Sequence, residues 1–94
     1  MAEPLIRLNA EGGLWVRQLH FVHATDVHIG HLHSHDHVTL LATGSLQVTV
    51  DGVSQTFNAP HIILITKGKH HDLQAMVDGT VAYCVAPIAD VTTS

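Results

Sequence analysis

The chain has 94 residues, of which 46% are hydrophobic, and a formal net charge of −4 with only four lysines and arginines. A chain of this length forms one small domain, and its apolar fraction is typical of a globular fold rather than a disordered one. The few basic and aromatic residues exclude the charged footprint and the base-stacking surface of a nucleic-acid-binding protein.

Strand patterns recur along the chain, separated by turns rich in Gly, Asn and Asp. The first predicted strand is LWVRQLHFV, residues 14–22, whose odd-numbered and even-numbered side chains lie on opposite faces. Further strands are predicted at residues 26–33, 37–43, 46–50, 53–57, 61–66, 71–77 and 80–88. Between two of them, Asp51-Gly52 supplies the positive φ of a two-residue hairpin turn.

These short strands, without a helix of useful length, predict an all-β fold, either a sandwich or a jelly-roll barrel of antiparallel strands. We expect one domain over residues 1–94, with its core at about 14–88 and frayed termini. The opening stretch lacks the apolar segment of a signal peptide, and no apolar run is long enough to span a bilayer. We therefore expect no membrane contact. The single cysteine excludes an internal disulfide, so we expect a cytoplasmic protein.

Charged residues make up only 13% of the chain, which is few for the surface of a monomer. A small domain buries only about 60–65% of the surface that its unfolded chain exposes, so its core is marginal. We therefore expect a partner subunit to cover part of the surface, most simply in a homodimer.

The segment GHLHSHDHVTLLATG, residues 30–44, has a histidine at every second position from His31 to His37. Because residues i and i+2 of a strand share a face, His31 and His33 point the same way. If residues 34–36 form a tight crossing between strands, His37 begins the next strand and can also turn inward. Converging imidazoles suit Zn, Cu, Fe or Ni.

A fourth ligand must come from elsewhere in the chain, and the candidate segment is TKGKHHDL, residues 66–73. A turn at Gly68 would bring His70 and His71 to the mouth of a barrel. A helical alternative would use the i,i+4 pairs of residues 31/35 and 33/37, but no HExxH motif is present and the flanking residues favour strands.

Both segments resemble the sequence motifs of the cupin family. The spacing His31-x-His33-x3-His37-x6-Gly44 resembles the first cupin motif, in which the third ligand is usually glutamate. The segment TKGKHH, residues 66–71, resembles the second motif, with threonine in place of its proline and His71 in place of its last ligand. The resemblance covers residues from about 20 to 88 and implies a small single-domain cupin.

The resemblance also implies one divalent transition metal ion (Zn, Ni, Cu, Fe or Mn), held by His31, His33, His37 and His71. Histidine in place of glutamate at position 37 resembles the subgroup of small cupins with four-histidine sites. Four neutral imidazoles leave the full charge of the metal uncompensated, which favours an anionic ligand.

Two functions follow from this resemblance. The first is a metalloenzyme, for example a dioxygenase, lyase or isomerase, acting on a small metabolite that bears a carbonyl, enol or carboxylate group. The second is a ligand-binding or sensing module whose metal is structural or gates the ligand. The lack of an evident general acid or base in the sequence supports the second function, but the chemistry available to the metal makes the enzyme the preferred prediction.

Other residues could line the pocket beside the metal. The candidates are Thr39, Leu41, His20 and Tyr83. Thr39 and Leu41 share a strand face with His37, and His20 lies on a strand that borders the pocket in cupins. Tyr83 and its neighbour Cys84 lie on the last strand, where one of the two must face inward.

Several polar residues receive a simpler interpretation. We expect His35 to belong to the turn between strands, and His70 to lie at the rim, although a one-residue slip would exchange it with His71. Arg17 and Gln18 are the nearest polar groups on the early strand. One of them could point at a substrate, but the simpler expectation is that both lie in solvent.

Overall fold

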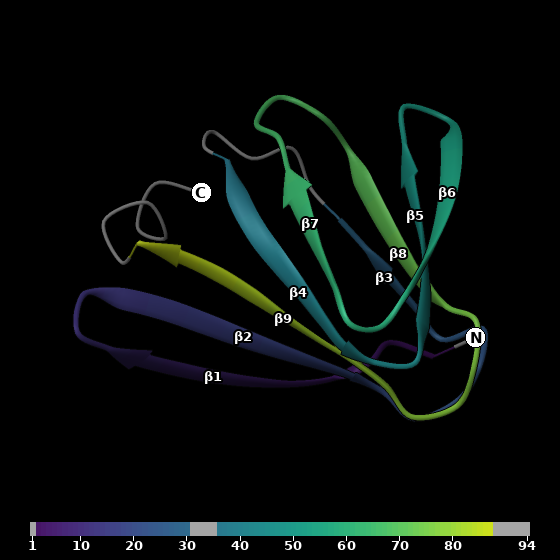
Figure 1. The fold of residues 1–94 in the computed structure, drawn as a ribbon, viewed down its shortest axis with the longest axis horizontal. Helices are drawn as coiled ribbons and strands as arrows, with labels where there is room; N and C mark the ends of the chain where they lie inside the picture. The colour runs from purple at the N-terminus through teal and green to yellow at the C-terminus, as the bar shows by residue number, and fades with distance from the viewer. Residues whose placement is uncertain (1, 31–35, 88–94) are drawn as a thin grey trace.

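The computed structural model describes residues 2–30 and 36–87, apart from the side chain of His37, and this part of the chain forms nine β-strands (Figure 1). The strands are β1 (Leu5–Glu11), β2 (Leu14–Phe21), β3 (Val27–Ile29), β4 (His37–Thr43), β5 (Ser45–Val50), β6 (Val53–Asn58), β7 (His61–Ile65), β8 (His71–Ala75) and β9 (Thr80–Pro87). They form a five-stranded sheet in the order β1-β2-β9-β4-β7 and a four-stranded sheet in the order β3-β8-β5-β6. Every pairing is antiparallel, which confirms the predicted all-β fold.

The path of the chain between the two sheets is that of a jelly roll. After β2 the chain passes to β3 in the four-stranded sheet and returns to β4. It then forms the hairpin β5–β6 in the four-stranded sheet, returns to β7, crosses to β8 and ends in β9 of the five-stranded sheet. Figure 1 shows the strands of both sheets converging near the N-terminus and diverging toward the end where β4 begins and β9 ends. Both β4 and β8 begin at the end where the sheets diverge.

Alternating apolar residues on the inner faces form the core between the sheets. In β2, Leu19 and Phe21 are fully buried, and in β4 the same is true of Leu41. Leu46 of β5 and Leu73 of β8 face them from the other sheet as part of the same hydrophobic cluster. Burying each such side chain contributes about 1.5–3 kcal/mol. This alternation fixes the register of each strand, because a slip by one residue would expose its apolar set.

The hairpin between β5 and β6 forms as predicted. Asp51 and Gly52 have φ values of 50° and 81°, and Val50 pairs with Val53 on either side of them. Two successive positive φ angles match the twist of the flanking strands.

One strand was not predicted. Residues 5–11, which we expected to fray, pair with β2 along their whole length as the edge strand β1, from Leu5 opposite His20 to Glu11 opposite Leu14. All residues of β1 are exposed, so the strand extends the sheet without adding to the buried core.

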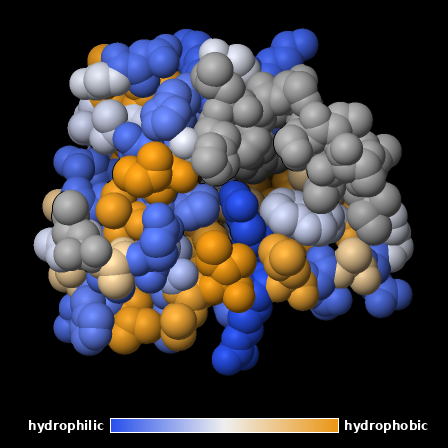
Figure 2. All heavy atoms as spheres, turned by 180° about the vertical axis from the view of Figure 1, so that it is seen from behind, coloured by the Kyte–Doolittle hydropathy of each residue, from blue (hydrophilic) through white to orange (hydrophobic). Residues whose placement is uncertain are grey.

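Exposed apolar side chains gather on the outer face of β4 and β7. Ile62 and Leu64 are 69% and 57% exposed, and Val38 and Leu40 beside them are each 39% exposed. Figure 2, which shows the molecule from behind, also has apolar side chains in separate patches among polar ones. Within the part of the chain that the structure describes, there is no helix long and apolar enough to cross a membrane.

Candidate metal centre

Two hydrogen bonds connect the histidine-rich segment to the segment that contains His71. The backbone N–H of Gly30 donates to Oδ1 of Asp72 over 3.3 Å. The backbone N–H of Lys67 donates to Oδ1 of Asp36 over 2.7 Å. Gly30 and Asp36 are the described residues on either side of 31–35, and Lys67 and Asp72 lie on either side of His71. The fold therefore brings the flanks of the two sequence motifs together.

Gly30 packs directly against the backbone of His71. A Cβ atom added at Gly30 would overlap the carbonyl oxygen of His71 and lie 2.9 Å from its carbonyl carbon. Real Cβ atoms essentially never come within 3.0 Å of another heavy atom, so only glycine fits here without a shift of the backbone. The glycine at position 30 therefore permits the close approach between the end of β3 and the start of β8.

His71 is the first residue of β8, and its side chain is oriented by a local hydrogen bond. The residue is 4% exposed, and its Nδ1 lies 3.0 Å from the carbonyl oxygen of Lys69. Because a carbonyl only accepts hydrogen bonds, Nδ1 carries a proton, and in the neutral imidazole Nε2 then has the free lone pair. This is the tautomer of a histidine that binds a metal through Nε2. The turn before it is made at Gly68, whose φ is 75°.

The other predicted ligands are only partly described by the structure. His37 is the first residue of β4 and pairs with Ile65, the last residue of β7, but its side chain lies outside the described part. His31 and His33 lie outside the described residues, as does His35. Among the described residues no three His, Cys, Asp or Glu side chains form a metal-binding group.

His70 and His71 have different environments, as the alternation of a strand requires. His70 is exposed, and its Nε2 lies 2.9 Å from Oδ1 of Asp72. His71 is buried on the face of β8 that also carries Leu73 and Ala75. This difference favours His71 as the histidine that faces the interior.

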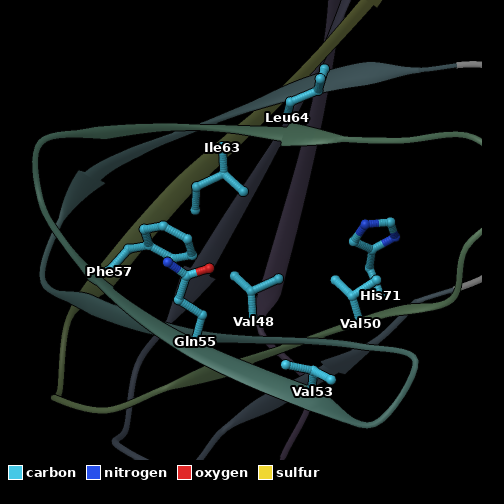
Figure 3. A pocket seen from close by; sticks show the side chains of 8 residues that line it. All are labelled: Val48, Val50, Val53, Gln55, Phe57, Ile63, Leu64 and His71. Carbon is cyan, nitrogen blue, oxygen red and sulfur yellow. The ribbon is translucent and has the colours of Figure 1, made fainter.

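A cavity of about 190 Å³ opens beside His71 between the two sheets. It is lined by Val48, Val50, Val53, Gln55, Phe57, Ile63, Leu64 and His71. Figure 3 shows Ile63 of β7 and Val48 of β5 pointing from opposite sides into the space next to the His71 ring. Gln55 and His71 supply the only polar side chains of this lining, so the described wall is mostly apolar.

Thr39 and Leu41 lie on the inner face of β4, as predicted from their parity. Both are fully buried, and Oγ1 of Thr39 lies 3.4 Å from Sγ of Cys84. Neither belongs to the lining of the cavity beside His71. In the described part of the chain they act as core residues between the sheets.

The other two pocket candidates, His20 and Tyr83, lie on the outer face of the five-stranded sheet, so neither of them lines the interior. His20 lies between two fully buried residues of β2, so alternation turns it outward. Tyr83 accepts a 2.9 Å hydrogen bond from Nε2 of Gln18 and lines a shallow outer hollow of about 320 Å³. Cys84, 1% exposed, is the inward-facing residue of the Tyr83–Cys84 pair.

Sequence reasoning missed the two aspartates that connect the motifs. Asp36 lies inside the histidine-rich segment and Asp72 directly follows the His70-His71 pair. An acidic residue beside each histidine cluster was the available signal, because carboxylates commonly support metal-binding segments through hydrogen bonds.

Comparison with known proteins identifies the fold. No family model matches this chain, and no curated protein sequence matches it. Among solved structures it is similar to an uncharacterized conserved protein with a double-stranded β-helix domain from Klebsiella pneumoniae, with a TM-score of 0.78 and 20% identity, covering 94% of this chain and 80% of that one. It is similar to a cupin-2 domain-containing protein from Shewanella frigidimarina, with a TM-score of 0.68 and 20% identity over 88% of this chain and 79% of that one.

A third similar structure is KdgF from Halomonas sp., with a TM-score of 0.74 and 16% identity over 85% of this chain and 74% of that one. These similarities show that the chain has the cupin fold. The predicted jelly-roll architecture is therefore confirmed.

Proposed function

We propose that this cupin binds one divalent transition metal ion through His31, His33, His37 and His71 and is a metal-dependent enzyme for a small oxygenated metabolite. The observation that supports the proposal most directly is the pair of hydrogen bonds that joins the flanks of both motifs, Gly30 to Asp72 and Asp36 to Lys67. Three histidines lie on one motif and the fourth on the other, so this junction is what a shared site requires.

The residues present fit such an ion. His71 is buried, and the carbonyl of Lys69 holds its ring in the tautomer that leaves Nε2 available. Imidazole nitrogens suit Zn, Ni, Cu and Fe, and Mn is accepted when it is the available ion. When bound, the ion would supply Lewis-acid polarisation of a carbonyl, enol or carboxylate oxygen, the basis of oxygenase, lyase and isomerase chemistry in this proposal.

The chain itself contributes orientation and exclusion of water. The apolar wall formed by Val48, Phe57 and Ile63 would favour the carbon skeleton of a small metabolite and exclude water beside His71. Asp72 accepts hydrogen bonds both from Gly30 and from His70, so it holds the end of β3 against the start of β8.

The test is metal analysis of protein purified without a histidine tag, followed by calorimetric titration with Zn²⁺ and Ni²⁺. We expect one ion per chain in the wild type, and a large loss of affinity in His33→Ala and His71→Ala. His61→Ala, on an exposed position of β7, is the matched control and should keep the wild-type affinity. Unchanged stoichiometry and affinity in His33→Ala and His71→Ala would refute the ligand assignment.

The mostly apolar lining favours a second candidate function, the binding or sensing of a small ligand without turnover. The described cavity wall offers no carboxylate, and its only titratable side chain is His71, itself a proposed ligand. Incubating the metal-loaded protein with a panel of keto acids and diketones, followed by NMR, separates the two functions. Consumption of a compound supports the enzyme, whereas reversible shifts without consumption support the binding module.

A further inference from the structure

Arg17 is turned toward the interior of the fold, although we expected it in solvent. It lies on β2 with the parity of Leu19 and Phe21, both fully buried. Of the four lysines and arginines, all of which the structure describes, Arg7, Lys67 and Lys69 are exposed, and only Arg17 is half-buried. A cation on the inner face of a sheet loses hydration that it must recover from another partner.

No such partner exists among the described residues. The Nε atom of Arg17 is buried and has no hydrogen-bond partner there. Its neighbours on the inner face are apolar or neutral, with Leu8 and Cys84 opposite it in the adjoining strands. Neither ion pair found in the described part of the chain includes Arg17.

The guanidinium group is instead held by an aromatic ring. Its Cζ lies 5.4 Å from the ring centroid of Trp15, two residues earlier on the same face of β2. Such a cation–π contact favours a guanidinium position over the ring and does not occupy its N–H donors. Arg17 thus presents N–H donors that have no acceptor among the described residues, and the fork of these donors matches the geometry of a carboxylate.

We infer that Arg17 binds the carboxylate of a small anionic ligand between the two sheets. In register, Arg17 pairs with Cys84 and Cys84 with Thr39, two residues after the start of β4 at His37. From the usual spacing of strands and residues, the backbones at positions 17 and 37 are separated by roughly 12 Å. A metabolite of a few carbon atoms can span much of such a separation. This last step rests on the proposed metal site, whereas the role of Arg17 as an anion-binding residue does not.

The experiment is an NMR titration of the folded protein with sodium pyruvate, and with neutral methyl pyruvate as the uncharged control. The variants are Arg17→Gln and Arg17→Lys, with Arg7→Gln on the exposed edge strand as the matched control. Each is measured after removal of metal with EDTA and again with Zn²⁺ added. Loss of a hydrogen-bonded charged partner should weaken pyruvate binding about tenfold to a hundredfold in Arg17→Gln.

We expect Arg17→Lys to recover part of that affinity, because lysine keeps the charge but not the planar donors. Arg7→Gln should bind pyruvate like the wild type, and methyl pyruvate should bind all variants equally weakly. If Arg17→Gln does not fold, the fluorescence of the wild type is measured instead, because Trp15 is the only tryptophan. Pyruvate should change this fluorescence, and methyl pyruvate should not.

Equal pyruvate affinity in the wild type and Arg17→Gln would overturn the inference, as would absence of pyruvate binding by the wild type. The two proposals can fail separately. If the metal site is wrong, added Zn²⁺ leaves pyruvate affinity unchanged while its dependence on Arg17 persists. If Arg17 has no role, Zn²⁺ still binds, and Arg17→Gln titrates like the wild type.

Discussion

Replacing Gly30 with alanine should separate the two halves of the candidate metal site. The added Cβ would overlap the carbonyl oxygen of His71 and lie 2.9 Å from the carbonyl carbon, whereas ordinary contacts begin at 3.4 Å. Both obstructing atoms belong to the backbone, so no side-chain rotation relieves the overlap. The end of β3 would therefore have to move away from β8, stretching the hydrogen bond from Gly30 to Asp72.

The expected cost follows from overpacking at a backbone contact. Forced insertion of one methyl group into a packed site costs about 1–3 kcal/mol. A domain of this size has a free energy of unfolding of about 5–14 kcal/mol, so the change is a substantial fraction of the total. At about 4–8 °C per kcal/mol, Tm should fall by at least about 4 °C. Metal affinity should also fall about tenfold, because the segment that follows Gly30 carries His31 and His33.

The assay combines urea denaturation of the metal-free protein with calorimetric metal titration of each folded variant. Gly52→Ala is the control, because its Cβ would meet nothing within 4 Å and only its φ of 81° disfavours alanine. The control should lose about 1–2 kcal/mol of stability from this conformational strain and keep its metal affinity. A Gly30→Ala variant with wild-type stability and metal affinity would show that the approach of β3 to His71 constrains neither the fold nor the site.

Three further predictions concern the anchor of the site, the outer hollow and the exposed sheet face. Asp72→Ala should lower metal affinity about tenfold to a hundredfold in titration calorimetry, whereas Asp78→Ala, which also removes an acceptor of a backbone N–H, should not. Tyr83→Phe should lower the free energy of unfolding by about 1 kcal/mol in urea denaturation and leave metal binding unchanged, since its hydroxyl bonds on the outer face. We propose that the wild type is a homodimer whose interface is the exposed apolar face of β4 and β7. The double variant Ile62→Lys with Leu64→Lys should then sediment as a monomer. A wild type that sediments as a monomer would contradict this.

Most of the fold could be predicted because its strands alternate clearly between apolar and polar residues. The exception, β1, carried a usable signal: Ile6, Leu8 and Ala10 alternate with Arg7 and Asn9, and the Gly12-Gly13 pair that follows is a typical two-residue hairpin turn. From the sequence, however, we predict only that this stretch is not a signal peptide and that it frays. Its apolar residues stay exposed in the structure, so hydrophobic burial gave little reason to expect a strand there.

The candidate site was less predictable than the fold, because it depends on contacts between distant segments. Motif spacing indicated which histidines belong together, but the bond between Asp36 and Lys67 requires the register of β4 against β7. Arg17 shows a different limit. Its parity with Leu19 and Phe21 was visible in the sequence, yet the general rule that charged side chains face solvent outweighed it. A charged side chain on the inner face of a strand is therefore a candidate for a functional role.

The position of the site also bears on how so small a domain holds together. β4 belongs to the five-stranded sheet and β8 to the four-stranded sheet, so an ion held by His37 and His71 would cross-link the two sheets. It would do so at the end where the sheets diverge (Figure 1). The core residues Phe21 and Leu46 hold the sheets together elsewhere. An ion that binds only the folded state stabilises it by about 4 kcal/mol at a thousandfold excess over its dissociation constant. The same cross-link would fix the separation between β4 and β8, and with it the width of the cavity beside His71. A single arrangement of strands would then determine three properties: metal binding, the stability of the end where the sheets diverge, and the size of ligand that fits.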